Sequence, residues 1–264
     1  MVYSIQMTLF SLLVGAGASL GLWLVVRSSP RWYFRRRLET GFLVLLGALL
    51  GARLVFAAIH SAYFSQHPSE ILQVWLGGLS WPGAVLGGLI VVLVVSMAWK
   101  IPLARLADVL EPLVPPLAVA VWLGCWQAGS GYGIRAPLDT WWGVPAPDES
   151  GLALPRFPLQ LVAASTLLLY TFLLDLTTQN LAYPGQKAVL VLLGLAINLL
   201  VFSFFQADPV PLWNGLRWDV WAALGFTLLS GALCLMAFWR SLKKTIRSRL
   251  KRAAMRRRFN DARR

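Results

Sequence analysis

The chain has 264 residues, of which 58% are hydrophobic and 13% are charged, and its formal net charge is +13. A soluble domain carries about 25% charged residues and about 45–50% apolar ones, and this chain has too few polar side chains to cover so large an apolar core. Composition therefore excludes a soluble globular protein, a disordered chain and a disulfide-stapled secreted domain. It indicates a polytopic membrane protein.

Apolar stretches long enough to cross a bilayer recur along the chain. A spanning helix needs about 20 apolar residues, because nothing in the hydrocarbon core can hydrogen-bond a bare backbone. Seven stretches qualify, at residues 5–26, 41–64, 79–99, 107–127, 159–176, 188–205 and 220–239. We expect an all-α integral membrane protein, with a seven-helix membrane domain over 1–239, long loops at 64–78 and 128–158, and a basic tail over 240–264.

The basic residues predict how the chain is oriented. One set of alternate connecting segments holds 20 of them, twelve in the tail, whereas the other set holds only Arg135, Arg156 and Arg217. Positively charged segments stay in the cytoplasm, so we expect the N-terminus outside, the C-terminus in the cytoplasm and both long loops facing outward. Basic blocks beside apolar spans typically set topology and touch anionic lipid, so no nucleic-acid partner is expected.

Arg53 lies near the middle of the second predicted span. A charge at that depth needs a wet cavity or a partner, and it is a functional hypothesis by default. One interpretation is an anion site, for example for a phospholipid phosphate. The other is a structural ion pair with Asp108 or Glu111 of the fourth span, which share one helical face because they are three residues apart. The sequence leaves both interpretations open.

Other polar and small residues indicate close helix packing rather than known soluble catalysis. Amides such as Gln160 and Asn198 commonly join membrane helices by hydrogen bonds, and Gly83 and Gly87 have the four-residue spacing of close helix contacts. The two histidines form no metal-ligand cluster, and no phosphate-cradling or dinucleotide glycine motif is present. The residues alone therefore predict an outward-facing polar pocket for an amphipathic ligand such as a lipid, with neither a metal nor a cofactor.

Five segments in chain order resemble one enzyme family: LLGALLGARLVF (45–56), EILQVWLGGLSWPGAVLGG (70–88), ADVLEPLVPP (107–116), WLGCWQAGSGYGIRAPLDTWWGV (122–144) and PRFPLQLVAA (155–164). They resemble the bacterial prolipoprotein diacylglyceryl transferases, which move diacylglycerol from phosphatidylglycerol onto the lipobox cysteine of a prolipoprotein. The resemblance implies a multi-pass protein of the bacterial inner membrane, with phosphatidylglycerol and a prolipoprotein as partners.

The resemblance also implies a set of site residues. The candidates for binding the lipid phosphate are Arg53, Arg135, Tyr132 and Gln160, with Arg156 as a further arginine on the outer side. Those expected to line the cavity or to allow close packing are Gly83, Gly87, Gly124 and Gly133.

Several positions depart from the family pattern. Pro82 stands where the family has a histidine, and Trp122 and Asn198 stand where it has arginines, the first of which the family uses to hold the phosphatidylglycerol phosphate. Phe157 and Val162 likewise replace a histidine and a tyrosine. Two hypotheses follow: a divergent transferase in which Arg53 and Arg135 grip the phosphate, and a catalytically inactive relative that binds lipid or a membrane partner. No catalytic residue is assigned.

Overall fold

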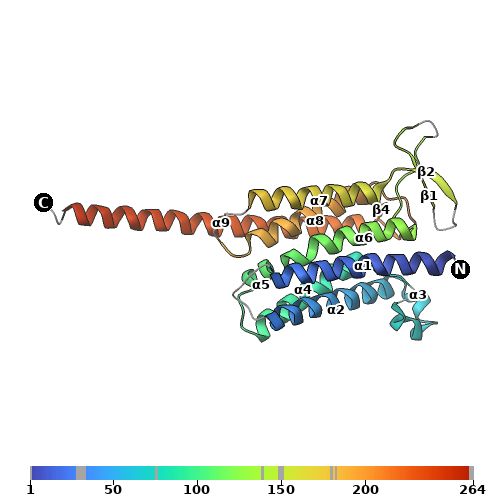
Figure 1. The fold of residues 1–264 in the computed structure, drawn as a ribbon, viewed down its shortest axis with the longest axis horizontal. Coiled ribbons are helices and arrows are strands. Elements are labelled where there is room, and N and C mark those ends of the chain that lie inside the picture. The colour runs from blue at the N-terminus through green and yellow to red at the C-terminus, as the bar shows by residue number, and fades with distance from the viewer. Residues whose placement is uncertain are drawn as a thin grey trace.

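Figure 1 shows a computed structural model of the chain, which describes residues 2–27, 34–74, 77–137, 140–147, 152–178, 181 and 183–261, with the backbone alone at 2–8 and 247–261. The long helices are α1 (Val2–Arg27), α2 (Phe34–Ile59), α4 (Trp81–Ala98), α6 (Val114–Ala128), α7 (Leu159–Thr177), α8 (Gln186–Ser203) and α9 (Trp218–Asp261). Shorter helical segments are α3 (Ser61–Phe64), η1 (Pro68–Leu72), α5 (Leu103–Leu110) and η3 (Glu111–Leu113). Two antiparallel hairpins pair β1 (Val144–Pro147) with β2 (Ala153–Arg156) and β3 (Leu212–Trp213) with β4 (Leu216–Arg217).

Among the residues that the structure describes, seven helical segments are long and apolar enough to cross a membrane, which confirms the expected all-α architecture with seven spans. The second span differs from its predicted limits of 41–64. α2 begins at Phe34 and ends at Ile59, and α3 is a separate turn after His60. Arg, Leu and Glu are good helix formers, so the backbone becomes helical before the sequence becomes apolar. Arg53 consequently lies in the last turns of α2 rather than at mid-span.

Two other spans also differ from a simple helix. The fourth consists of α5 and α6 joined by the 3₁₀ turn η3, because Pro112 lies in η3 and proline disfavours a continuous α-helix. The last, α9, continues without interruption from Trp218 to Asp261. The predicted boundary between bundle and tail at residue 239 therefore lies inside one helix.

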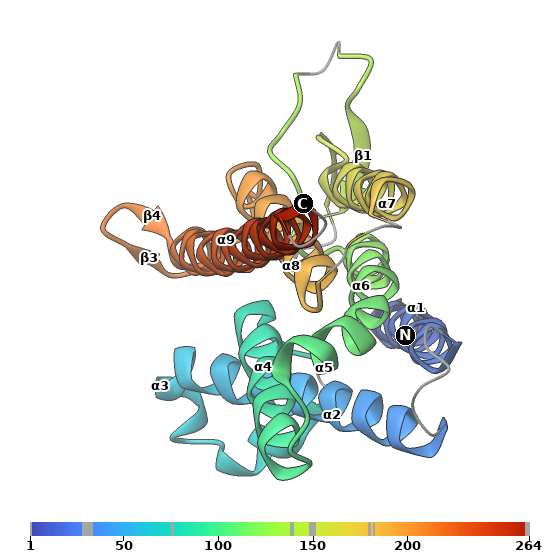
Figure 2. The same ribbon diagram turned by 90° about the vertical axis from the view of Figure 1, so that its left-hand side faces the viewer.

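The helices run roughly side by side along the long axis of the molecule (Figure 1). α2 packs against α4, α1 against α6, and α8 against α9, while α7 contacts both α6 and α8. Viewed along the axis in Figure 2, α1, α2 and α4 lie on one side of α6, and α7, α8 and α9 lie on the other. We call the end that carries α3, η1 and the β1–β2 hairpin the loop end, and the end from which α9 projects the tail end.

Glycines allow α2 and α4 to approach closely. Gly83 and Gly87 of α4 lie against Gly51 and Gly47 of α2, and a Cβ atom at any of these positions would overlap the facing helix. Pro82 is buried in the first turn of α4. Proline is tolerated there because the backbone N–H that it lacks would have no acceptor within the helix. Small residues thus hold α4, and the turn that precedes it, directly against the end of α2.

Candidate functional site

A short backbone ladder ties the loop end together. Residues 132–136, which follow α6, lie between residues 155–157 before α7 and residues 205–207 after α8. Backbone hydrogen bonds therefore connect the segments that flank three membrane helices, α6, α7 and α8. The ladder hydrogen bonds join Ile134 N to Phe205 O, Ala207 N to Tyr132 O, Ala136 N to Pro155 O and Phe157 N to Ile134 O, at 2.9–3.0 Å.

Two arginines face each other across this ladder. Arg135 and Arg156 form an antiparallel bridge without direct hydrogen bonds between them, the arrangement in which opposite side chains lie closest and on the same face. Arg135 is exposed, whereas Arg156 is buried and its guanidinium carbon lies 4.2 Å from the centroid of the Tyr132 ring. Arg156 Nη1 also donates to the Gly133 carbonyl at 3.5 Å, so Arg135 is the exposed charge of this pair.

Two further residues predicted for the site, Gln160 and Gly133, lie close to this arginine pair. Gln160, in the first turn of α7, is buried, and its Nε2 donates to the Ser130 carbonyl at 2.9 Å. Gly133 packs so closely on the Phe157 carbonyl that a Cβ atom would overlap it. Arg135, Tyr132, Gln160 and Gly133 thus gather at the loop end of α6 and α7. Gly124 lies farther along α6, against the ring of Phe10 in α1.

Arg53 lies apart from this group and anchors the segment 70–78, which begins inside η1. Its guanidinium is buried and donates five hydrogen bonds, a number equal to all the N–H groups of an arginine side chain. All five acceptors are backbone carbonyls of the same segment. They are Ile71 O at 2.9 Å from Nε, Gly77 O and Gly78 O at 2.6 and 3.1 Å from Nη1, and Glu70 O and Gln73 O at 2.5 and 3.3 Å from Nη2.

This geometry overturns the interpretation of Arg53 as the partner of Asp108 or Glu111. Asp108 instead accepts hydrogen bonds from Gly185 N and Ala188 N at the start of α8, and Glu111 pairs with Lys187, so neither acid is the partner of Arg53. A phosphate would find every N–H of Arg53 already donated in this conformation. The partners are backbone dipoles of a loop, which a search for charged side chains does not detect.

Trp122 and Asn198 are hydrogen-bonded to each other in the interior of the bundle. The indole Nε1 of Trp122 donates to the Asn198 Oδ1 at 3.1 Å, although the two residues are 76 positions apart. The Asn198 Nδ2 in turn donates to Ala163 O and Thr166 Oγ1, at 3.1 and 3.2 Å. An apolar cluster surrounds the pair and contains Leu159, Ala163, Ala164 and Phe202.

The family described as prolipoprotein diacylglyceryl transferase matches residues 1–237. The chain belongs to this family. It is similar to the phosphatidylglycerol–prolipoprotein diacylglyceryl transferase of Ruegeria pomeroyi, with 32% identity over 218 residues that cover 74% of this chain and 72% of that protein. It is also similar to the protein of the same name from Bordetella parapertussis, with 30% identity over 200 residues that cover 74% of this chain and 75% of that protein.

A charged network at the loop end of this transferase-family fold was not identified from the sequence. Arg217 donates through Nε and Nη2 to the two oxygens of Asp219, at 3.1 and 2.9 Å, and through Nη2 to Asp208 at 3.1 Å. Burial raises the pKa of Asp208 above the ordinary aspartate value, and the Arg217 charge opposes that rise. The spacing of Arg217 and Asp219, two residues apart at a predicted helix start, is the only local signal for this network.

Proposed function

We propose that this chain binds phospholipid at the loop end of the family fold and does not catalyse the transfer for which its relatives are named. The hydrogen bond between Trp122 and Asn198 carries the proposal. The family resemblance places an arginine at each of these positions. This chain has two neutral side chains there, and they are hydrogen-bonded to each other.

A phosphate near hydrocarbon needs charge-assisted hydrogen bonds, which the arginine fork supplies and neutral side chains do not. Tryptophan has one N–H group, and Trp122 donates it to Asn198. The amide of Asn198 has two N–H groups, and it donates to Ala163 and Thr166. Both residues thus use their donors within the protein. The stabilisation of a leaving phosphate, commonly the largest single contribution to catalysis, is consequently reduced.

Proton transfer is weakened in the same way. Pro82 and Phe157 stand where the resemblance places histidines, and neither side chain can accept or donate a proton. Pro82 is buried in the first turn of α4, and Phe157 packs against the rings of Trp142 and Phe205. Both positions therefore serve packing in this chain.

Lipid binding is supported by Arg135 and Arg156. The exposed guanidinium of Arg135, which is paired in the backbone ladder with the buried Arg156, suits the phosphate of an anionic lipid of the phosphatidylglycerol type. In the orientation that the loop charges predict, this face meets the outer leaflet of a bacterial inner membrane. The seven spans and the family support a multi-pass membrane protein there.

A second candidate function is diacylglyceryl transfer by a relocated phosphate site. The same arginine pair favours it, because Arg135 and Arg156 could stabilise a leaving glycerol phosphate while the prolipoprotein cysteine thiolate attacks the glyceryl carbon. The names of the similar proteins also favour it.

A transfer assay separates the two functions. The full chain is expressed in cells depleted of their own transferase, and the mass of a lipobox prolipoprotein is followed, with the Ruegeria pomeroyi relative as positive control. We expect no diacylglyceryl mass increment from the correctly inserted chain. An increment that disappears with Arg135→Ala would overturn this proposal and establish the relocated site.

Lipid binding is tested separately, on the purified full chain titrated with phosphatidylglycerol and examined by native mass spectrometry. Arg135→Ala should weaken retention roughly tenfold, the factor that one charge-assisted hydrogen bond supplies. Arg105→Ala is the matched control, because Arg105 is also exposed but lies at the tail end. Equal retention by the wild type and both variants would contradict a lipid site at the arginine pair.

A further inference from the structure

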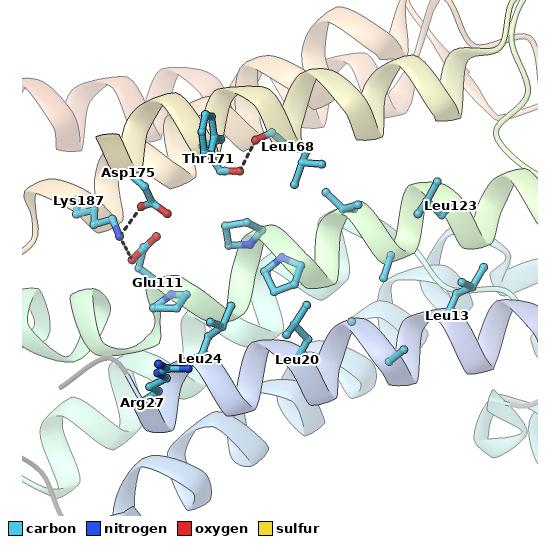
Figure 3. Close-up of a pocket in the computed structure, with 18 residues that line it drawn as sticks. Leu13, Leu20, Leu24, Arg27, Glu111, Leu123, Leu168, Thr171, Asp175 and Lys187 are labelled. Carbon is cyan, nitrogen blue, oxygen red and sulfur yellow. Dashed lines mark hydrogen bonds and ion pairs between the residues drawn. The ribbon is translucent and has the colours of Figure 1, made fainter. Parts of the chain in front are cut away.

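A groove of about 740 Å³ runs along the outside of the bundle between α1, α6 and α7 (Figure 3). It lies within the size range of small-molecule sites, about 300–1,000 Å³. Its wall is formed by apolar side chains such as Leu13, Leu20 and Leu24 of α1, Leu123 of α6, and Leu168 and Phe172 of α7. Leu20, Leu168 and Phe172 are each at least half exposed within membrane-spanning segments, so the groove opens to the lipid phase.

The groove extends along most of α1. From Leu13 to Arg27 the helix rises about 21 Å at about 1.5 Å per residue, which exceeds half of a hydrocarbon core of about 30 Å. One end is therefore level with lipid headgroups at the tail end, and the other lies past the membrane midplane. A molecule that fills it has a polar group at one end and a chain about as long as one leaflet is thick.

Charged side chains gather only at the tail end of the groove lining (Figure 3). Lys187 of α8 lies 2.8 Å from Asp175 of α7 and 3.2 Å from Glu111 of η3. The Glu111 carboxylate is buried, whereas the side chain of Asp175 is 63% exposed. Arg27 of α1 is exposed, and no carboxylate lies within ion-pair distance of it among the described residues. The Lys187 side chain is 34% exposed, so the two most exposed of these charges are a cation from α1 and an anion from α7.

We propose that this groove binds a phospholipid of the tail-end leaflet whose headgroup carries both a phosphate and a primary ammonium group, as in phosphatidylethanolamine. Arg27 would bind the phosphate, Asp175 would accept hydrogen bonds from the ammonium, and one acyl chain would lie along Leu20 and Leu168. The four charged residues sum to zero, which matches a zwitterionic headgroup. A purely anionic headgroup would meet the carboxylates, and a quaternary ammonium has no N–H to donate. This site lies at the opposite end from the arginine pair and does not rest on the proposed function.

The test titrates the purified, delipidated full chain carrying Arg135→Ala, which weakens the loop-end site, with phosphatidylethanolamine, phosphatidylglycerol and phosphatidylcholine of identical acyl chains and records retained lipid by native mass spectrometry. We expect phosphatidylethanolamine to be retained best. Leu20→Trp, which fills the groove, should weaken its retention roughly tenfold or more, whereas Leu12→Trp should not. Leu12 is the matched control, because it is exposed on the same helix but does not line the groove.

A second pair of variants tests the opposite wall, so that a folding defect in one helix does not decide the result. Leu168→Trp should reduce retention, and its neighbour Leu169→Trp, exposed but outside the groove, should not. Asp175→Asn should lower the preference for phosphatidylethanolamine over phosphatidylcholine roughly tenfold, the contribution of one charge-assisted hydrogen bond. Equal retention of the three lipids, or equal effects of groove and control variants, would overturn the proposal and identify the lipid as non-specific annular lipid.

Discussion

Replacing Arg53 with methionine should release the segment 70–78 while leaving the helix bundle folded. The substitution keeps a long apolar stem but removes all five donors to the carbonyls of residues 70–78. A hydrogen bond to a charged group contributes about 1.5–3 kcal/mol, so the sum would exceed what local opening of a loop costs. The loop should therefore open rather than stay buried with unpaired carbonyls.

Hydrogen exchange of the full chain in lipid nanodiscs measures this opening. Loss of even one such bond, about 1.5–3 kcal/mol, corresponds to between about ten- and one-hundredfold faster exchange. The effect should be confined to residues 68–80, including the Ser80 amide that donates to the Ala52 carbonyl at 3.1 Å. Arg53→Lys should give an intermediate result, because lysine has three donors for five acceptors.

The opposite pattern would refute the reasoning. If Arg53→Met left exchange of residues 68–80 unchanged but abolished phosphatidylglycerol retention, the guanidinium would be a lipid ligand and not the anchor of the loop. Arg105→Ala is the matched control for that comparison, since Arg105 is exposed and lies at the tail end, outside the segment.

Three further predictions concern packing and charge. Asn198→Leu should lower the free energy of unfolding by about 1–3 kcal/mol, because it leaves the buried Trp122 N–H unpaired. The double variant with Trp122→Phe should lose less free energy of unfolding than the two single variants added together. Strict additivity in this double-mutant cycle would contradict the coupling. Gly87→Leu should separate α2 from α4 and prevent recovery of folded protein in detergent, because its side chain would overlap Gly47; normal yield and melting would show that the contact is dispensable. The pKa of Asp208 is higher in the folded protein than its ordinary value, so its stabilising contribution is present below about pH 4 and is lost as pH rises through the folded pKa. The melting temperature of the wild type relative to Asp208→Asn should therefore fall as pH is raised from about 4 to about 7, and a constant difference would contradict the raised pKa.

Hydropathy was sufficient to predict the seven spans because a bilayer requires long apolar stretches. It could not place the start of α2, because Arg35 and Glu39 are polar yet helical and form an ion pair across one turn. Nor could it place α3 outside the span, because Ser61–Phe64 continues the apolar run and only the chain direction changes.

The candidate site was predictable where its residues are neighbours in the sequence and unpredictable where they meet through the fold. Tyr132 and Arg135 are found together because one loop carries both. Arg53 required a partner on physical grounds, but its acceptors are backbone carbonyls that no residue type reveals. The contact of Trp122 with Asn198 joins α6 to α8, so the sequence shows two unrelated positions where the structure contains one interaction.

That interaction also makes the two positions hard to change one at a time. An arginine at position 122 alone would enter an apolar cluster opposite an amide that cannot neutralise it, and an arginine at position 198 alone would face an indole N–H of the wrong polarity. Each single change therefore gives a less stable protein than the present pair. A charged anion site at this depth could be built here only by redesigning both helices together.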